Sequence, residues 1–389
     1  MSGRHGVPSP RAPDVSGAPS HPAPRRPETR RRSRIGEFLV VGGATPLLFV
    51  ISWLMRETLE LSDAEYATGF TFYYAAHLLN DPHFSVTYLL FYEDARGRLL
   101  GDRFGRTQKV RYWLAGVVAP LGLGIWAISA LATESAVSLG LMFQLMFLLV
   151  GWHYVKQGFG VMMVLSARRG IRFTPRERFV ILAHAYAGWF YAWASPIDTG
   201  RRIVEKQVVY TTVAHPPYLE QVTLVLFGIS TVALIVVLAM KRRREGPVAL
   251  LTPLTGLLCS VWAWSVFSGI DPLVRYAVPA LHSLQYLYFV RLLKEPQARE
   301  REGPPFFETS ARNRLGLLVV SALVLGAILF DLAPMALDET LTPSGGYANP
   351  DMGSTPYFAA LFTFVNIHHY CMDAVIWRKE NKQTRYLSM

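Results

Sequence analysis

The chain has 389 residues, of which 51% are hydrophobic and 17% charged, and its formal net charge is +11. Two cysteines, Cys259 and Cys371, are too few for a disulfide framework or a cysteine-based metal knuckle. Apolar runs of about 20 residues, the length that crosses a bilayer as a helix, recur along the chain. We therefore expect an all-α, polytopic integral membrane helix bundle.

The first 34 residues differ from the rest of the chain. They are rich in Pro, Ser, Gly and Arg and contain almost no large apolar residue. Such a segment cannot bury a core, so it is predicted to be a disordered basic tail and not a secretory signal. We expect three parts: the tail 1–34, a ten-helix transmembrane domain 35–378 and a short cytoplasmic tail 379–389.

Ten membrane spans are predicted in the transmembrane domain. The second is long and contains Asn80-Asp81-Pro82, where the proline removes a helical hydrogen bond and is expected to kink or break the helix. The ten ranges are 35–55, 66–92, 112–132, 136–165, 179–194, 222–240, 247–267, 272–292, 315–335 and 356–377.

The distribution of Lys and Arg predicts the orientation of these spans. With ten spans, 33 of the 39 basic residues fall on the side that holds both termini, five fall on the other side, and Lys156 lies within a span. Both termini are therefore expected in the cytoplasm. The positive charge then serves orientation and contact with anionic lipid, and no nucleic-acid partner is expected. Arginine outnumbers lysine 32 to 7, as in high-GC genomes, which favours a bacterial cytoplasmic (inner) membrane.

Six histidines lie within four of the ten predicted spans. With a helical rise of about 1.5 Å per residue, five of them fall about 13 to 18 Å from the cytoplasmic ends, and His77 about 22 Å. This depth is near the middle of a hydrocarbon core about 30 Å thick, where an ionisable group is costly unless it is paired or bound. Histidine is also the commonest metal ligand. The six candidate ligands are His77, His83, His153, His282, His368 and His369.

Most of these histidines have a polar residue one helical turn onward, on the same helix face. These neighbours are predicted to orient the ligands or to be additional ligands: Asp81, Gln157, Gln285 and Asp373. Lys156, the one cation inside a span, is a candidate contact for an anion or substrate, with snorkelling as the alternative. The adjacent His368 and His369 diverge by about 100° on a helix, so they could serve two ions, or one could be structural.

The motifs do not assign a family. The chain has no P-loop, dinucleotide fingerprint, GxSxG or HExxH motif. The segment NIHHYCMD is similar to the histidine boxes of integral-membrane desaturases and hydroxylases, but the spacing here is H-x5-H, isolated histidines and one HH, whereas those families use HxxxH and HxxHH boxes.

The histidine layer predicts an intramembrane metal site. A histidine set joined by carboxylates favours non-haem iron, one ion or a di-iron pair, over haem b or copper. The predicted function is a membrane oxidoreductase of oxygenase, hydroxylase or desaturase type in lipid metabolism, with an apolar lipid-like substrate and an electron donor as partners. Three alternatives stay open: a haem-b electron-transfer protein, a proton-coupled transporter with a His/Asp/Lys relay, and a metal-free structural subunit.

Overall fold

The computed structural model describes residues 34–58, 61–101, 104–195, 200–246, 250–267, 272–302 and 309–388. Glu37–Met389 forms one compact unit, and the secondary structure of its described residues is helical apart from one short hairpin. The predicted disordered tail 1–34 lies outside the described residues, apart from residue 34.

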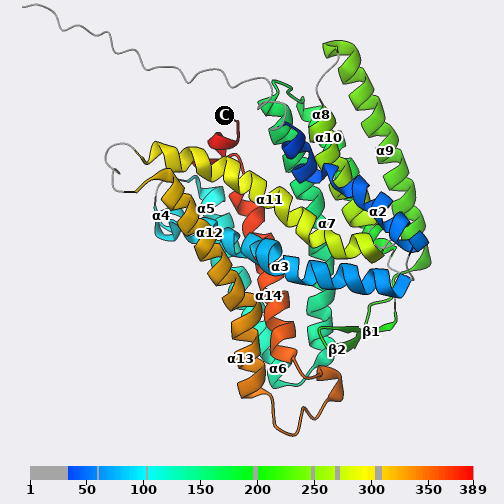
Figure 1. Ribbon diagram of the computed structural model, residues 1–389, viewed down its shortest axis with the longest axis vertical. Helices are drawn as coiled ribbons and strands as arrows, with labels where there is room; N and C mark the ends of the chain where they lie inside the picture. Colours follow the sequence, from blue (N-terminus) through cyan, green and yellow to red (C-terminus); the bar gives the residue numbers. More distant parts are fainter. Residues whose placement is uncertain are drawn as a thin grey trace, which may run out of the picture. The chain divides into compact units, whose positions relative to one another are not determined.

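Thirteen α-helices occur in the described residues (Figure 1). Their bounds are α2 (Thr45–Thr58), α3 (Leu61–Tyr92), α4 (Ala95–Leu99), α5 (Arg106–Trp113), α6 (Ala119–Ala132), α7 (Ala136–Arg168), α8 (Pro175–Ala194), α9 (Pro217–Glu245), α10 (Leu251–Leu258), α11 (Pro272–Glu300), α12 (Ala311–Ala327), α13 (Ala333–Leu341) and α14 (Pro356–Ile376). Short π-helical segments are η1 (Leu39–Gly43), η2 (Leu114–Val118), η3 (Cys259–Val266) and η5 (Ile328–Leu332), and short 3₁₀ helices are η6 (Pro350–Met352) and η7 (Lys382–Ser388).

Two strands, β1 (Arg202–Glu205) and β2 (Val208–Thr211), pair as an antiparallel hairpin. The two residues between them, Lys206 and Gln207, both have positive φ, which is the conformation of a type I′ turn. Strand β2 packs on α7 so closely that a Cβ at Gly140 would lie 2.5 Å from Cβ of Tyr210. Only glycine therefore fits at that position of α7.

The prediction of ten membrane spans is wrong for the described residues. Four helical stretches are long and apolar enough to cross a membrane: Arg106–Ala132, Ala136–Arg168, Pro217–Glu245 and Ala311–Leu341. A fifth is possible if Arg34–Gly43 and Thr45–Met55, which meet at a bend of 64°, are one span. The remaining predicted spans are helical, but their apolar runs are shorter or are interrupted by polar side chains such as Asp81 in α3 and Asp373 in α14.

The sequence predicted a kink or a break of the second span at Pro82, and the break does not occur. The helix α3 runs without interruption from Leu61 to Tyr92 with Pro82 inside it. Proline removes only one helical hydrogen bond, and the packing of α3 on α11, α12 and α14 holds the helix on both sides of that position. In Figure 1, α3 and α11 run obliquely across α7 and α14.

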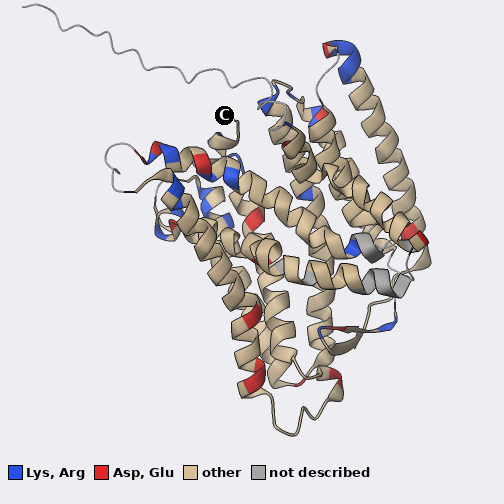
Figure 2. Ribbon diagram, viewed as in Figure 1, with Lys and Arg blue, Asp and Glu red and all other residues tan. Residues whose placement is uncertain are grey.

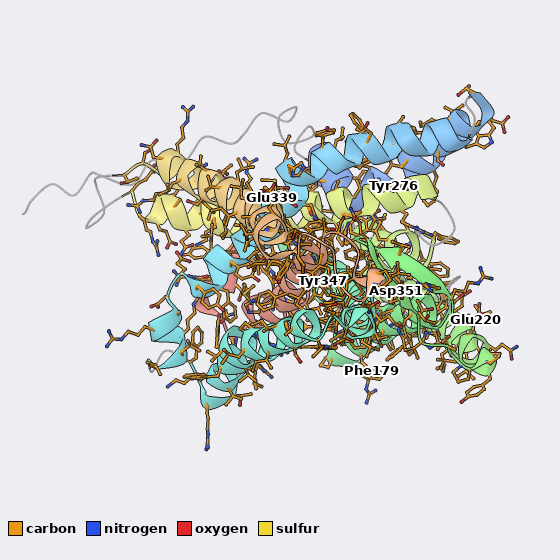
Figure 3. All side chains as sticks on the ribbon, turned by 90° about the horizontal axis from the view of Figure 1, so that it is seen from below. Phe179, Glu220, Tyr276, Glu339, Tyr347 and Asp351 are labelled. Carbon is orange, nitrogen blue, oxygen red and sulfur yellow. The ribbon has the colours of Figure 1, made fainter. Side chains whose placement is uncertain are left out.

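The surface of the compact unit separates apolar faces from charged ends. On α9, Val225, Ile229 and Val232 are each about 60% exposed, which suits contact with lipid and not with water. Lys and Arg gather at one end of the helices, at the top of Figure 2. The opposite end, seen from below in Figure 3, carries the labelled carboxylates Glu220, Glu339 and Asp351 from three different elements. These features suggest a membrane location.

Four apolar clusters form the core, and polar residues lie between two of them. Along α14, Ala359 to Ile367 contribute to one cluster and Met372 to Ile376 to another. His368 and His369 lie between these two segments. The fold therefore encloses the histidines in apolar surroundings on both sides.

Candidate metal centre

Four histidines from four different helices meet in the interior of the compact unit. His83 comes from α3, His153 from α7, His282 from α11 and His369 from α14, and none is more than 4% exposed. Nε2 of His153 lies 3.1 Å from Nε2 of His282 and 3.3 Å from Nε2 of His369. The His83 ring lies 4.9 Å from the His282 ring and 4.5 Å from the His369 ring, between centroids.

The distances from Nε2 of His153 to Nε2 of its two neighbours match the separation between adjacent ligand atoms around a metal ion. Nitrogen ligands lie about 2.0–2.1 Å from an ion such as Zn²⁺, so neighbouring ligand atoms are separated by about 3.3 Å in a tetrahedron and about 2.9 Å in an octahedron. The observed separations of 3.1 and 3.3 Å fall in this range. An imidazole nitrogen has a single in-plane site, so Nε2 of His153 cannot hydrogen-bond well to both neighbours. One cation can accept the lone pairs of His153 and His369, whereas His282 lies outside the group of ligand atoms that all lie within 4.8 Å of one another.

Asp373 adds a carboxylate to the cluster. Its Oδ2 lies 3.5 Å from Nε2 of His369 and 3.6 Å from Nδ1 of His153. Its Oδ1 accepts hydrogen bonds from the Tyr286 hydroxyl at 2.8 Å and from the Trp377 indole N–H at 3.2 Å. These two donors leave Oδ2 to face the histidines, either as a ligand or as the acceptor that fixes the His153 ring.

The His83 ring is oriented by a hydrogen-bonded chain across to α11. The Ser283 hydroxyl donates to the side-chain oxygen of Asn80 at 3.2 Å, so Ser283 Oγ accepts from Nδ1–H of His83, also at 3.2 Å. In a neutral imidazole the second nitrogen then carries a lone pair. That nitrogen, Nε2, is buried in the cluster and has no hydrogen-bond partner among the described residues. Its tautomer and position are those of a metal ligand.

Two further ring nitrogens in the cluster are buried without a hydrogen-bond partner among the described residues: Nδ1 of His282 and Nδ1 of His369. Because Nε2 of each of these rings faces His153, the two Nδ1 atoms lie on the other side of the rings and are not ligand atoms for an ion in the cluster. The ligand atoms of His83, His153, His369 and Asp373 all lie within 4.8 Å of one another. This buried group could hold a metal ion.

His77 and Asp81 lie in a separate group. Nδ1 of His77 is 3.2 Å from Asp81 and 3.4 Å from Asp331 in η5, and the side chains of His77 and Asp331 are 37% and 42% exposed. These three residues could also hold an ion, but the His77 and Asp331 side chains are partly accessible.

His368 faces away from the cluster. Its ring nitrogens contact the Tyr88 hydroxyl and the carbonyl oxygen of Ala115, each at 3.0 Å. Adjacent positions on α14 therefore place His369 in the buried cluster and His368 against α3 and η2.

The two glutamines and the lysine do not face the ring nitrogens. Gln157 donates to Gln285 at 2.7 Å and to the carbonyl oxygen of His282 at 3.2 Å, and Gln285 donates to the carbonyl oxygen of Val41 at 2.6 Å. Both thus support the backbone near the cluster. Lys156 is half-buried on α7 and is not part of the cavity wall beside the histidines.

Sequence reasoning missed Ser283, Tyr286 and Trp377, the residues that orient His83 and Asp373. Trp377 carried a local signal, because it lies four residues after its partner Asp373, whereas Tyr286 donates to Asp373 from 87 positions away. Ser283 is next to His282 on α11 but serves His83, 200 residues away, and local spacing cannot show such a contact.

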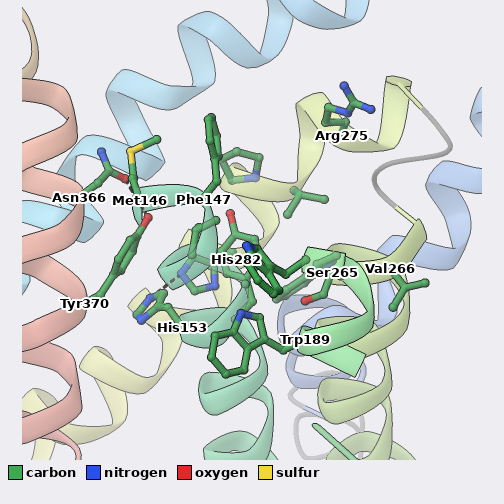
Figure 4. Close-up of a pocket in the computed structure, with 18 of the residues that line it drawn as sticks. Met146, Phe147, His153, Trp189, Ser265, Val266, Arg275, His282, Asn366 and Tyr370 are labelled. Carbon is green, nitrogen blue, oxygen red and sulfur yellow. Dashed lines mark hydrogen bonds between the residues drawn. The ribbon is translucent and has the colours of Figure 1, made fainter. Parts of the chain in front are cut away.

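A cavity of about 590 Å³ adjoins the histidines (Figure 4). His83, His153 and His282 form part of its wall, whereas His369 and Asp373 do not. In Figure 4, His153 and His282 face each other, Tyr370 and Asn366 lie on one side of them, and Arg275 lies at the far side of the cavity. The remaining wall is mostly apolar and aromatic, with Phe84, Met146, Phe147, Val150, Trp189, Trp264, Val278 and Phe362 among its residues.

Comparisons with known proteins give no relative. No protein-family model matches the chain, and no curated protein or solved structure is significantly similar to it. The function must therefore be argued from the site alone.

Proposed function

We propose that the chain is an integral-membrane metalloprotein whose buried histidine cluster holds a transition metal, and that it acts as an oxidoreductase. The observation that carries this proposal is the buried group of His83, His153, His369 and Asp373, whose ligand atoms all lie within 4.8 Å of one another, with Nε2 of His369 3.3 Å from Nε2 of His153 and 3.5 Å from Oδ2 of Asp373. Simple helix packing does not need four histidines from four helices in contact.

Non-haem iron is the metal that we propose, as one ion or a pair. Imidazole suits iron, copper and zinc, and sites that combine histidines with a carboxylate and keep open positions are typical of non-haem iron oxygenases. Such an ion supplies redox chemistry that side chains alone lack. His83 and His153 in the cavity wall would hold the ion together with His369 and Asp373 and would leave its open side toward the cavity.

Haem b fits this arrangement poorly. Two axial nitrogens on opposite faces of a porphyrin are about 4 Å apart with the macrocycle between them. Here the rings pack on one another, with centroids of His153 and His282 4.8 Å apart and of His153 and His369 4.9 Å apart. Histidine rings in such close contact leave no space for a porphyrin between them.

The substrate that we propose is an apolar, lipid-like molecule that enters the cavity from the membrane. The aromatic and aliphatic wall supports such a ligand, because apolar pockets with a few polar groups bind and orient apolar molecules. A bacterial cytoplasmic membrane and a separate electron donor complete the proposal.

Elemental analysis of the detergent-purified protein, combined with UV–visible absorption, tests the metal site. We expect about one or two iron ions per chain in the wild type and a large loss of metal in His153→Gln and His369→Gln, because each removes a ligand. His184→Gln is the matched control, since His184 is also fully buried but contacts Ser230 and Trp262 on other elements. It should retain the metal.

Two results would contradict the proposal. A wild-type protein that holds no iron, copper or zinc, and that cannot be reconstituted, would favour the proton-relay or structural alternatives. A Soret band that disappears in His153→Gln would assign the cluster to haem.

A further inference from the structure

A groove separate from the cavity beside the histidines lies between α3, α11 and α12. It has a volume of about 620 Å³. Its wall is apolar along most of its length and includes residues that are open to the surroundings, such as Leu78 at 69% and Val319 at 57% exposure. The apolar wall is formed by Leu78, Pro82, Val86, Leu287, Val290, Ala311, Leu315, Leu318, Val319, Ala322 and Leu323.

One end of this groove is strongly basic. Arg291, Lys294 and Arg299 from the end of α11 and Arg312 from the start of α12 line it, together with one carboxylate, Glu295. Glu295 bonds Arg291 at 3.1 Å and Arg299 at 2.6 Å, so a single negative charge is shared by two arginines, and Lys294 pairs with Glu93 at 2.7 Å. Figure 2 shows this end among the basic ends of the helices. The groove thus has an excess of positive charge at one end only.

The length of the groove fits one leaflet of a bilayer. From Arg312 to Leu323 on α12 the helical rise amounts to about 16 Å. Half of a hydrocarbon core is about 15 Å. A molecule that places a negative group beside Arg312 would therefore place its apolar chain along the groove to the middle of the membrane.

We propose that this groove binds an anionic phospholipid, with the phosphate at the basic end of α11 and α12 and an acyl chain along the apolar wall. Basic pockets between membrane helices on the side with most Lys and Arg commonly bind such head groups. A free phosphate would use only the basic end and would leave the apolar wall uncovered. The bound lipid would contact Pro82, in the same turn of α3 as His83. This inference does not depend on the metal site.

Native mass spectrometry of the detergent-purified protein, titrated with dioleoyl phosphatidylglycerol and dioleoyl phosphatidylcholine, tests the charge requirement. Because one basic residue near a membrane surface contributes about 1 kcal/mol, Arg312→Glu should raise the Kd for phosphatidylglycerol at least about fivefold, with the Kd for phosphatidylcholine unchanged. The matched control is Arg243→Glu at the exposed end of α9, which should change neither Kd. Equal binding of the two lipids, or equal effects of the two variants, would overturn the proposal.

A second pair of variants tests the apolar wall without a change of charge. Val319→Trp should fill the groove and weaken phosphatidylglycerol binding at least about fivefold, whereas Val320→Trp, at an equally exposed neighbour outside the groove, should not. Excess inorganic phosphate should leave the lipid bound. If phosphate displaces the lipid completely, or if both tryptophan variants bind it like the wild type, the site binds an anion and not a phospholipid. The two tryptophan variants test whether the groove binds an acyl chain even if Arg312→Glu does not fold.

Discussion

At the scale of single residues, the orientation of Asp373 is the feature that makes the cluster more than a group of histidines. Tyr286 and Trp377 donate to one carboxylate oxygen and leave the other toward His153 and His369. The Tyr286 hydroxyl is itself held at 2.6 Å from the Thr87 hydroxyl. A carboxylate fixed in this way loses little side-chain entropy when an ion binds, so the supporting hydroxyl should contribute to metal affinity.

Tyr286→Phe tests that contribution. The change removes the hydroxyl and keeps the ring, so packing is conserved while Asp373 loses one of its two donors. We expect a metal affinity about 10- to 100-fold lower, the usual cost of removing an outer-shell partner. Competition with a chelator of known affinity measures the change.

Tyr288→Phe is the control on the same helix, because its hydroxyl donates to Glu37 at 3.0 Å and does not contact the cluster. It should bind the metal like the wild type. Equal affinities of the two variants would mean that Tyr286 does not position Asp373 for an ion.

The candidate site could be predicted from sequence only as a set of residues at one depth. His153, His282 and His369 were found because the Lys/Arg pattern and the helical rise placed them in one layer. The sequence could not separate His369 from His368, because this depends on which face of α14 turns inward. It also could not show that Gln285 bonds Val41, 244 residues away, and not a histidine. Long-range partners depend on helix packing that local spacing does not encode.

At the scale of elements, the junction of α8 and α9 is held by a buried carboxylate. Glu177 accepts from the backbone N–H of Thr174 at 2.8 Å and Thr174 Oγ1 accepts from the N–H of Glu177 at 3.3 Å, which is a capping box. Glu177 also pairs with Lys241 at 3.8 Å and with Arg244, both on α9. Burial acts to raise the pKa of Glu177, but the Thr174 N–H and these two cations outweigh it, so the pKa lies below its ordinary value.

Glu177→Gln should destabilise the protein by about 2 kcal/mol at pH 7, because an amide keeps part of the cap but loses the charge that faces Lys241 and Arg244. Folding lowers the pKa of this carboxyl, so the ionised group stabilises the folded protein. The full contribution to the free energy of unfolding is present above the pKa of the unfolded state and is lost as the pH falls through the lower pKa of the folded state. The gap in melting temperature between wild type and Glu177→Gln should therefore shrink below about pH 4.

Thermal unfolding in detergent at a series of pH values measures this gap. The exposed Glu380→Gln is the control, and its melting temperature should follow the wild type at every pH. A gap that stays constant down to pH 3 would show that the charge of Glu177 is not what stabilises the junction.

The elements themselves could be predicted only in part. Helices were expected at all ten apolar runs, and the described residues are helical there, but length and composition allow only four or five of them to cross a membrane. A polar residue in an apolar run does not prevent a helix, as Asp373 in α14 demonstrates, because neighbouring side chains satisfy it. The same residue lowers the hydropathy by which a span is recognised. Of the four helices that carry the site, α7 alone is long and apolar enough to cross a membrane, whereas α3, α11 and α14 are not.

At the scale of the whole molecule, the distribution of charge predicts which end of the compact unit faces which side of the membrane. The end of α9 with Arg242, Arg243 and Arg244 belongs to the basic end of the helices, and the segment between α13 and α14, with Ser344, belongs to the opposite end. Positive residues are retained on the cytoplasmic side of a membrane. Arg243 and Ser344 should therefore lie on opposite sides.

Cysteine labelling tests this orientation, because the native Cys259 is buried and Cys371 is half-buried on α14. Arg243→Cys should react with a membrane-impermeant maleimide only in inside-out vesicles, and Ser344→Cys only in right-side-out vesicles or intact cells, since both positions are exposed. The protein without added cysteine is the control for background labelling. Labelling of both positions from the same side would mean that the chain crosses the membrane an even number of times between Arg243 and Ser344, which contradicts α12–α13 as the one span in that stretch of the described residues.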